Sequence, residues 1–251
     1  MSEVTLTQAQ GLATISLNRP ARANALTDTL LADLHAALDA LEAPRALILR
    51  AEGRHFSTGG DVAAFAAALA TGAGEDYARR VVGGLNRAIL RLAALPCPVL
   101  MPVQGALTGG ALGLMLAADL VVMTPEAFLQ PWYTRVGFAP DGGWSAMLPA
   151  RIGPARARAV QLLNSRIGAA EALSLGLVQA ISADPEAQVA EWLTVLEGHI
   201  AGAMAATKAL MVDLPALEAA LEAERKAFVA RITLPEVAEG MARFLDDLKG
   251  A

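Results

Sequence analysis

Apolar and polar positions alternate along the first part of the chain and then change to a helical spacing. The stretches VTLTQ and LATISL place apolar side chains at about every second position and are separated by AQG, a pattern that predicts an antiparallel hairpin. After the loop NRPARANAL, leucines recur at positions 30, 31, 34, 38 and 41, the spacing of one helix face. Thr27 is a suitable N-cap for this run, so a helix of about four turns is expected to follow it.

Three further apolar segments predict buried strands. They are RALILRAEG at 45–53, VLMPVQG at 99–105 and LVVM at 120–123. Between the last two lies ALTGGALGLMLAAD, whose length and small residues suit a buried helix. Because strands and helices alternate along the chain, we expect an α/β fold with a parallel core sheet.

The last part of the chain has a different pattern. From about Glu191 onward it is helical by spacing and contains no strand signal, and Pro215 and Pro235 are expected to divide it into separate helices. The sequence therefore predicts two parts, a core over residues 1–190 and a C-terminal helical region over residues 191–251.

The composition is unusually apolar for a chain of 251 residues. Hydrophobic residues make up 55% and aromatic residues only 4%, with a mean hydropathy of +0.43. We therefore expect some apolar surface to be buried between subunits. The longest apolar run, at 111–123, is interrupted by Asp119 and is too short to cross a bilayer, and the first residues show no signal-peptide pattern. A cytoplasmic protein without a membrane partner is expected.

Charge and cysteine content narrow the possible partners. A net charge of −5 argues against nucleic acid as a ligand but leaves open a small polyanion bound by a few arginines. The single cysteine, Cys97, cannot form an internal disulfide and is interpreted as a buried apolar residue.

Four short stretches could carry chemistry, and each also has a purely structural interpretation. HFSTGGD at 55–61 and GALTGGALG at 105–113 are glycine turns that follow strands, and NRPARANAL is an arginine-containing loop. VGFAPDGGW places Asp141 between a proline and two glycines, where an aspartate could also serve as a helix N-cap.

Together these stretches suggest an active site. Two glycine turns that each offer a backbone N–H could form an oxyanion hole, and one nearby carboxylate could act as a general base. The three histidines lie far apart in the sequence, without the spacing of metal ligands, and neither a phosphate-binding loop nor a serine-hydrolase elbow is present. We therefore expect no metal and no separate cofactor.

In order and spacing, four stretches resemble the enoyl-CoA hydratase/isomerase (crotonase) family. They are NRPARANAL, HFSTGGDV, PVQGALTGGALGLMLAADLVV and GPARARAVQLLNSRIGAAEALSLGLV. The resemblance implies a crotonase-like spiral of ββα units whose C-terminal helices make trimer contacts. It also implies an acyl-CoA ligand and a homotrimer or dimer of trimers.

The resemblance also implies roles for individual residues. Gly60 and Gly110 match the two donors to the thioester carbonyl, and glycine lets a ligand approach the backbone closely. The positions that match CoA- or substrate-contacting segments are Arg22, Ala23, Thr58, Gly59, Asp61, Val62, Phe228 and Phe244, the two phenylalanines as candidates for contact with the adenine. Trp132, Tyr133, Phe138 and Trp144 surround Asp141 in sequence and either line an apolar pocket or belong to the core.

Two departures from the family pattern decide between reactions. Hydratases of this family carry two glutamates where this chain has Gly113 and Trp132. The loss of both argues against adding water to a double bond, whereas moving a double bond needs a single base. Asp141 lies where the isomerase branch has its acid/base aspartate. We therefore expect an enoyl-CoA isomerase with Asp141 as the proton shuttle.

Besides an enoyl-CoA hydratase, two alternatives remain open. One is an aryl-CoA dehalogenase, whose histidine and tryptophan would align with Asn86 and Tyr133 here. The other is an acyl-CoA-binding trimer that has lost catalysis.

Overall fold

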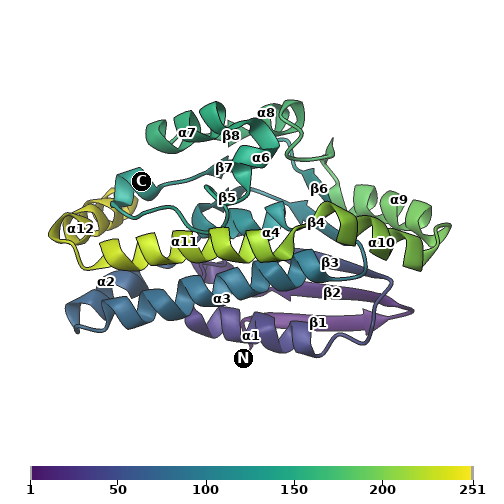
Figure 1. The fold of residues 1–251 in the computed structure, drawn as a ribbon, viewed down its shortest axis with the longest axis horizontal. Coiled ribbons are helices and arrows are strands. Elements are labelled where there is room, and N and C mark those ends of the chain that lie inside the picture. The colour runs from purple at the N-terminus through teal and green to yellow at the C-terminus, as the bar shows by residue number, and fades with distance from the viewer. Residues whose placement is uncertain (1, 250–251) are drawn as a thin grey trace.

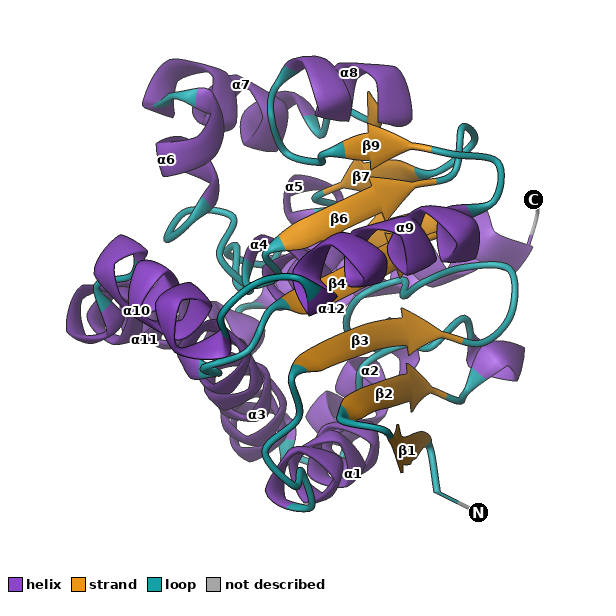
Figure 2. Ribbon diagram, turned by 90° about the vertical axis from the view of Figure 1, so that its right-hand side faces the viewer, coloured by secondary structure: helices purple, strands orange, loops and turns teal. Residues whose placement is uncertain are grey.

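A computed structural model describes residues 2–249 of the chain. Its main sheet has six strands in the order β1-β2-β3-β4-β6-β9, which rise in sequence through Figure 2. The strands are β1 Val4–Ala9, β2 Leu12–Leu17, β3 Ala46–Ala51, β4 Val99–Val103, β6 Leu120–Met123 and β9 Ala180–Ile181. Strands β1 and β2 pair antiparallel and the remaining neighbours pair parallel. The expected hairpin and parallel core are thus confirmed.

A second, smaller sheet corrects one expectation. The segment expected as a single helix begins as strand β5, Ala106–Thr108, an edge strand that pairs with β7, Phe128–Gln130, which in turn pairs with β8, Ile167–Gly168. Only then does the chain turn into a 3₁₀ turn, η2 at Gly109–Ala111, and the short helix α4 at Leu112–Leu116. Pairing of β5 with a strand some twenty residues later overrides the local helical preference.

Helices cover both faces of the main sheet. Helix α1, Asp28–Asp39, begins at the predicted cap, where Thr27 Oγ1 accepts the Leu30 N–H at 3.1 Å. Helix α3, Gly74–Ala94, packs against α1, and α11, Leu214–Ile232, lies along α3 across the width of Figure 1. On the other face, α9, Pro185–Glu197, packs against β4 and β6.

The remaining helices connect these layers. They are η1 Pro20–Arg22, α2 Val62–Ala70, α5 Tyr133–Val136, α6 Leu148–Ile152, α7 Pro154–Leu163, α8 Ala169–Ser174, α10 Ala201–Met211 and α12 Pro235–Lys249. Pro215 and Pro235 lie in the first turns of α11 and α12, as expected. The division of the chain into residues 1–190 and 191–251 stays a prediction. Residues 1, 250 and 251 lie outside the described residues. Over residues 2–249, no helix is both long and apolar enough to span a membrane.

Candidate active site

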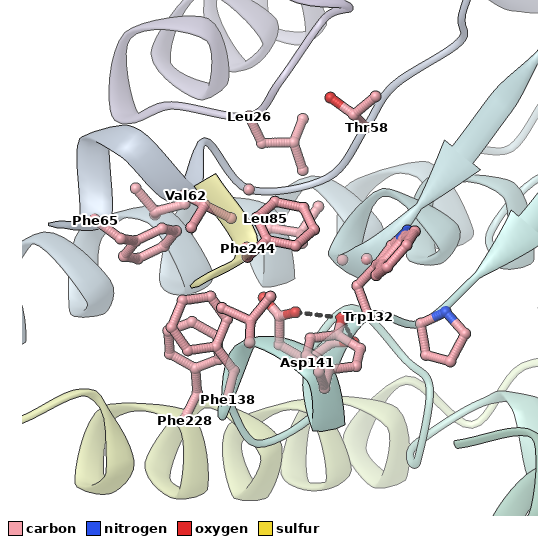
Figure 3. A pocket seen from close by; sticks show the side chains of 17 residues that line it. Leu26, Thr58, Val62, Phe65, Leu85, Trp132, Phe138, Asp141, Phe228 and Phe244 are labelled. Carbon is pink, nitrogen blue, oxygen red and sulfur yellow. Dashed lines mark hydrogen bonds between the residues drawn. The ribbon is translucent and has the colours of Figure 1, made fainter. Parts of the chain in front are cut away.

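A small cavity of about 50 Å³ opens where the two glycine turns meet the loop that carries Asp141. Its walls are mostly apolar, and the Asp141 carboxylate points into it between Phe138 and Trp132 (Figure 3). The predicted site residues that line it are Thr58, Gly60, Val62, Gly110, Trp132, Tyr133, Asp141, Phe228 and Phe244. Residues far apart in the sequence therefore converge on one space.

The two glycine turns lie side by side because short backbone bridges join them. Ser57 N–H donates to Ala106 O at 3.1 Å, and Thr108 N–H donates back to Ser57 O at 3.0 Å. A Cβ on Gly59 would lie only 2.7 Å from Thr108 O, so the turns approach to backbone contact. This arrangement brings the N–H groups of the two turns to the same wall of the cavity.

Among the described residues, neither the Gly60 N–H nor the Gly110 N–H donates to a backbone acceptor outside the helices and strands. Leu26 N–H donates to Gly59 O at 2.7 Å and Asp61 N–H donates to Leu26 O at 3.0 Å, a parallel bridge that skips the Gly60 N–H. Gly110 is the second residue of η2, where a helical N–H lacks an internal acceptor. Both groups are thus available to an oxygen bound in the cavity.

Asp141 is held against the second glycine turn. Gly142 has φ +60°, and a Cβ on it would lie 2.1 Å from Gly110 O, so only glycine allows this approach. A Cβ on Gly110 would lie 2.9 Å and 3.0 Å from the two carboxylate oxygens of Asp141. Tyr133 Oη donates to Asp141 Oδ1 at 2.6 Å, which leaves Oδ2 without a side-chain partner in the described part of the chain.

The surroundings of Asp141 favour its neutral form. Burial, helped by the negative charge of Glu224, raises the pKa of Asp141 to about 7, while the hydrogen bond from Tyr133 opposes the shift. Burial and the neighbouring Asp141 raise the pKa of Tyr133 well above its usual value, so Tyr133 remains a donor. A carboxylate that is half protonated at neutral pH can both accept and return a proton.

Asp141 is the one carboxylate among the described residues that line the cavity. A Cβ on Gly113 would lie 2.3 Å from Ile89 Cδ1 and 2.6 Å from Gly142 O, so no larger side chain fits there. Trp132, with φ +66°, packs its ring against Phe244 at a centroid distance of 5.5 Å. Both positions that could supply another acid are therefore filled by apolar packing.

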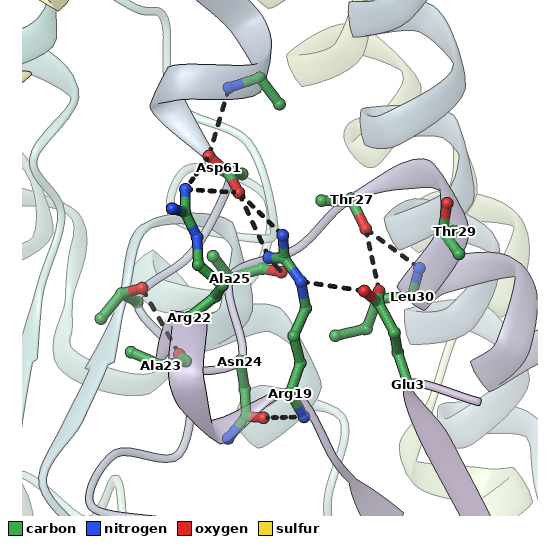
Figure 4. Close-up of polar contacts among 12 residues, drawn as sticks. Glu3, Arg19, Arg22, Ala23, Asn24, Ala25, Thr27, Thr29, Leu30 and Asp61 are labelled. Atoms are coloured by element: carbon green, nitrogen blue, oxygen red, sulfur yellow. Dashed lines mark hydrogen bonds and ion pairs between the residues drawn. The ribbon is translucent and has the colours of Figure 1, made fainter. Parts of the chain in front are cut away.

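The other predicted residues form a charged rim beside the cavity (Figure 4). Asp61 accepts from Arg19 at 3.2 Å and from Arg22 at 3.4 Å, and Arg19 also pairs with Glu3 at 3.0 Å. Thr58 N–H donates to Ala23 O at 3.1 Å and joins the first loop to the glycine turn. The Arg22 side chain is 56% exposed, so its guanidinium faces solvent at the rim.

Aromatic rings close the cavity. Phe138 lies between Phe65 and Phe228, with centroids 5.6 Å and 4.7 Å away. Phe228 and Phe244 thus line the apolar cavity, and their expected contact with adenine stays a prediction. Trp144, left open by the sequence, belongs to the core: it is fully buried and its Nε1 donates to Gly109 O at 2.7 Å.

One buried group around the site was not predicted. Glu224 accepts hydrogen bonds from the loop that follows Asp141. One of the donors, the Gly143 N–H, lies 81 positions before Glu224 in the sequence. Local sequence gives no sign of this contact, because Glu224 is one of several charged residues of α11. Over residues 2–249, no cluster of histidine, cysteine and acidic side chains could hold a metal ion.

Comparison with known proteins places this geometry in a family. Residues 7–250 match the family described as enoyl-CoA hydratase/isomerase. A Rhodobacter capsulatus protein named "Probable enoyl-CoA hydratase" is 38% identical over 67% of this chain, and the match spans 64% of that protein, just under two thirds of its length. Mycobacterium leprae "Probable enoyl-CoA hydratase echA6" is 31% identical over 93% of this chain and 92% of its own.

One of the relatives is named for a different reaction. The Arthrobacter 4-chlorobenzoyl coenzyme A dehalogenase-1 is 29% identical over 96% of this chain and 90% of its own. The crystal structure of enoyl-CoA hydratase from Bacillus halodurans superposes with a TM-score of 0.89 at 25% identity, covering 96% of this chain and all of that one, which confirms the crotonase-like α/β fold. The chain belongs to the enoyl-CoA hydratase/isomerase family.

Proposed function

We propose that the protein is an enoyl-CoA isomerase that converts 3-enoyl-CoA thioesters into 2-enoyl-CoA thioesters. The observation that carries this proposal is the single carboxylate in the cavity, raised to a pKa of about 7 and placed beside two free backbone N–H groups. Gly60 and Gly110 would donate to the thioester oxygen, and coenzyme A would enter as part of the substrate rather than as a cofactor.

The reaction needs only these groups. Asp141 Oδ2 removes a proton from C2, and the C2–H electron pair forms a C1–C2 double bond while the carbonyl π pair moves onto the thioester oxygen. When that pair returns to re-form the carbonyl, the C1–C2 π pair becomes the C2–C3 double bond, and the C3–C4 π pair takes the proton from Asp141 at C4. Negative charge that develops on the thioester oxygen in between is stabilised by the two N–H donors, each worth roughly 2.7–4 kcal/mol in comparable sites. The proton that leaves C2 returns at C4, so no further reactant is consumed.

The filled space around Gly113 supports isomerisation over hydration. Hydration needs groups that orient and deprotonate water as well as protonate carbon, and Ile89 with the Gly142 carbonyl occupies the room that a second acid would need. Dehalogenation has weaker support, because Asn86 donates to Leu221 O at 2.9 Å in the packing of α3 against α11 and does not line the cavity.

The rim would bind the rest of the coenzyme A ester. Arg22 offers an exposed guanidinium for a phosphate, and Ala23 with residues 58–62 would border the pantetheine. Phe228 and Phe244 carry the predicted aromatic contacts of the ligand. A cytoplasmic location stays a prediction.

Product analysis tests the proposal. Purified protein is mixed with 3-enoyl-CoA esters of different chain length in D₂O and followed by NMR, and we expect a 2-enoyl product. A 3-hydroxyacyl product would instead make the protein a hydratase, and halide release from 4-chlorobenzoyl-CoA would make it a dehalogenase. Tight acyl-CoA binding without any turnover would support a non-catalytic binding protein.

We also propose a homotrimer or a dimer of trimers. Large apolar side chains on α7, α10 and the turn before α10 are exposed, Leu163 by 76%, Ile200 by 77% and Leu210 by 89%, which supports contact with other subunits. Light scattering at micromolar concentration should give a mass that is a multiple of three chains. A species near the 26.0 kDa of one chain would contradict this.

A further inference from the structure

Glu224 is a buried carboxylate of α11 that binds one short loop. It is 4% exposed, and its Oε2 accepts the Gly143 N–H at 2.8 Å. Its Oε1 accepts the Ser145 N–H at 2.6 Å, the Ser145 hydroxyl at 2.7 Å and the Ala146 N–H at 2.8 Å. Burial raises the pKa of Glu224 above its ordinary value, while these four donors oppose the shift because they stabilise the ionised form, which accepts on both oxygens.

The same loop is fixed on its other side to the second glycine turn. Trp144 Nε1 donates to Gly109 O at 2.7 Å, and the backbone of Gly142 is packed on Gly110 so closely that a Cβ would lie 2.5 Å from the Gly110 Cα. Asp141 is the first residue of this loop. Together with the Tyr133 hydroxyl, these two anchors fix the backbone that carries the Asp141 carboxylate beside Gly110.

The charge of Glu224 also acts on Asp141. Tyr133 of α5 and Glu224 of α11 are the titratable groups that influence Asp141, while α3 contributes the apolar Leu85 and η2 contributes the Gly110 backbone. The negative charge of Glu224 raises the pKa of Asp141, in addition to the larger effect of burial. Thus one side chain both anchors the loop and opposes ionisation of the base.

We propose that Glu224 is a positioning residue that holds the Asp141–Ala146 loop against the Gly109–Gly110 turn and disfavours a second negative charge on Asp141. Its effect on proton transfer rests on the proposed function, whereas its effects on the loop and on the titration of Asp141 do not. α11 thereby becomes part of the active site although Glu224 does not line the cavity.

Three variants separate the two effects. Glu224→Gln keeps the length but removes the charge and turns an NH₂ group toward the backbone donors. Glu224→Asp keeps the charge but is one methylene too short to reach the loop. Glu222→Gln is the matched control, because Glu222 lies on the same helix and pairs with Arg225 at 2.6 Å at the surface.

The titration of Asp141 is followed by NMR of ¹³C-labelled aspartate carboxyl groups, with its signal identified by its absence in Asp141→Asn. In Glu224→Gln we expect the titration midpoint to fall by about one pH unit from its wild-type value and kcat to fall about tenfold or more. In Glu224→Asp we expect a similar fall in kcat with a midpoint closer to wild type. Glu222→Gln should change neither.

The outcomes distinguish this proposal from the proposed function. A folded Glu224→Gln protein with a wild-type midpoint and wild-type kcat would overturn the role of Glu224. A wild-type protein without isomerase activity would overturn the proposed function, and the NMR midpoints would still decide on Glu224. If Glu224→Gln does not fold, Glu224→Asp decides on the anchor, and a folded Glu224→Asp protein with a wild-type kcat would overturn the proposal that Glu224 positions the loop.

Discussion

Asp61 and Asp141 are equally buried, at 5% and 7% exposure, but their surroundings give them different chemistry. Asp61 follows Gly60 and accepts from two guanidinium groups, those of Arg19 and Arg22. Its Oδ1 also accepts the Ala64 N–H at 3.2 Å as the N-cap of α2. Asp141 packs on Gly110, and among the described residues its carboxylate receives one side-chain hydrogen bond, from the hydroxyl of Tyr133. Burial alone therefore does not produce a base.

The difference lies in what balances the charge. At Asp61 two cations and a backbone N–H compensate for the lost water, so the carboxylate is a structural anion that ties the first loop to α2. Among the described residues no cation pairs with Asp141, and a second carboxylate, Glu224, adds to the unfavourable effect of burial. A buried carboxylate becomes suited to proton transfer where cations and N–H donors do not fully compensate for its lost hydration.

The largest expected difference between the two aspartates is in turnover. Asp141→Asn should lower kcat by about 10²- to 10⁴-fold, because the amide cannot accept the C2 proton. Binding of an acyl-CoA product should persist, as measured by calorimetry, since the amide keeps the shape and can still accept from Tyr133.

Asp61→Asn is the comparison for this loss. An asparagine there can still cap α2, and we expect kcat to change by less than about tenfold because no proton passes through Asp61. If both variants lost turnover to the same extent while remaining folded, the contrast between a base and a structural anion would be wrong.

The second difference is in stability, and the two variants should shift it in opposite directions at pH 8. Asp141 has a folded-state pKa of about 7, above that of an unfolded chain, so its stabilising contribution is complete at low pH and is lost as the pH rises through 7. Asp141→Asn, which carries no charge, should then be more stable than wild type by about 2–4 kcal/mol at pH 8, and the gain should vanish near pH 4.

Asp61→Asn should do the reverse, because it leaves Arg19 and Arg22 without their anion, and we expect a loss of about 1–3 kcal/mol at neutral pH. Urea denaturation at several pH values measures both. A pH-independent difference between Asp141→Asn and wild type would contradict an elevated pKa of Asp141.

Much of this contrast was accessible from the sequence because its signals are local. Asp141 lies in a Pro-Asp-Gly-Gly turn, the two glycine turns follow recognisable strands, and the N-cap Thr27 directly precedes its helix. The family resemblance then assigned roles to these positions. The sequence also shows Gly113 and Trp132 where hydratases of the family carry two glutamates. This difference led to the choice of isomerisation, which stays a proposal.

Contacts between distant segments could not be predicted in this way. The strand at Ala106–Thr108 exists because β7 lies beside it, and its glycine-rich continuation looked helical from sequence alone. Glu224 is one of several acidic residues of α11, and only the packing of the loop against that helix distinguishes it. Trp144 likewise could not be assigned to core or cavity until its neighbours were known.

The third prediction concerns the side-chain hydrogen bond that the Asp141 carboxylate receives from Tyr133. Tyr133→Phe removes the donor that lowers the pKa of Asp141, so the pH at which kcat/KM falls should move upward from its wild-type value near 7. On the high-pH plateau we expect kcat to fall about tenfold, because the carboxylate loses its orientation. The pH profiles of kcat/KM for the variant and wild type measure this.

A downward shift of the profile in Tyr133→Phe would contradict the assignment of Tyr133 as donor. Glu224→Gln is the opposite perturbation, since it removes the negative charge rather than the hydrogen bond and should move the profile to lower pH. The two variants are thus expected to shift the pKa of Asp141 in opposite directions.

The smallest expected effect belongs to the rim. Arg22→Ala removes an exposed guanidinium that is expected to meet a phosphate of coenzyme A, and we expect KM to rise about two- to fivefold with kcat unchanged, because exposed ion pairs contribute little in water. The rise should shrink as salt is added. Arg79→Ala is the matched control, since Arg79 is an exposed arginine that pairs with Glu75 on the surface of α3, outside the cavity. An equal change of KM in both variants would mean that Arg22 acts only through the net charge of the protein. A fall in kcat for Arg22→Ala alone would mean that the rim takes part in the proton transfer proposed for Asp141.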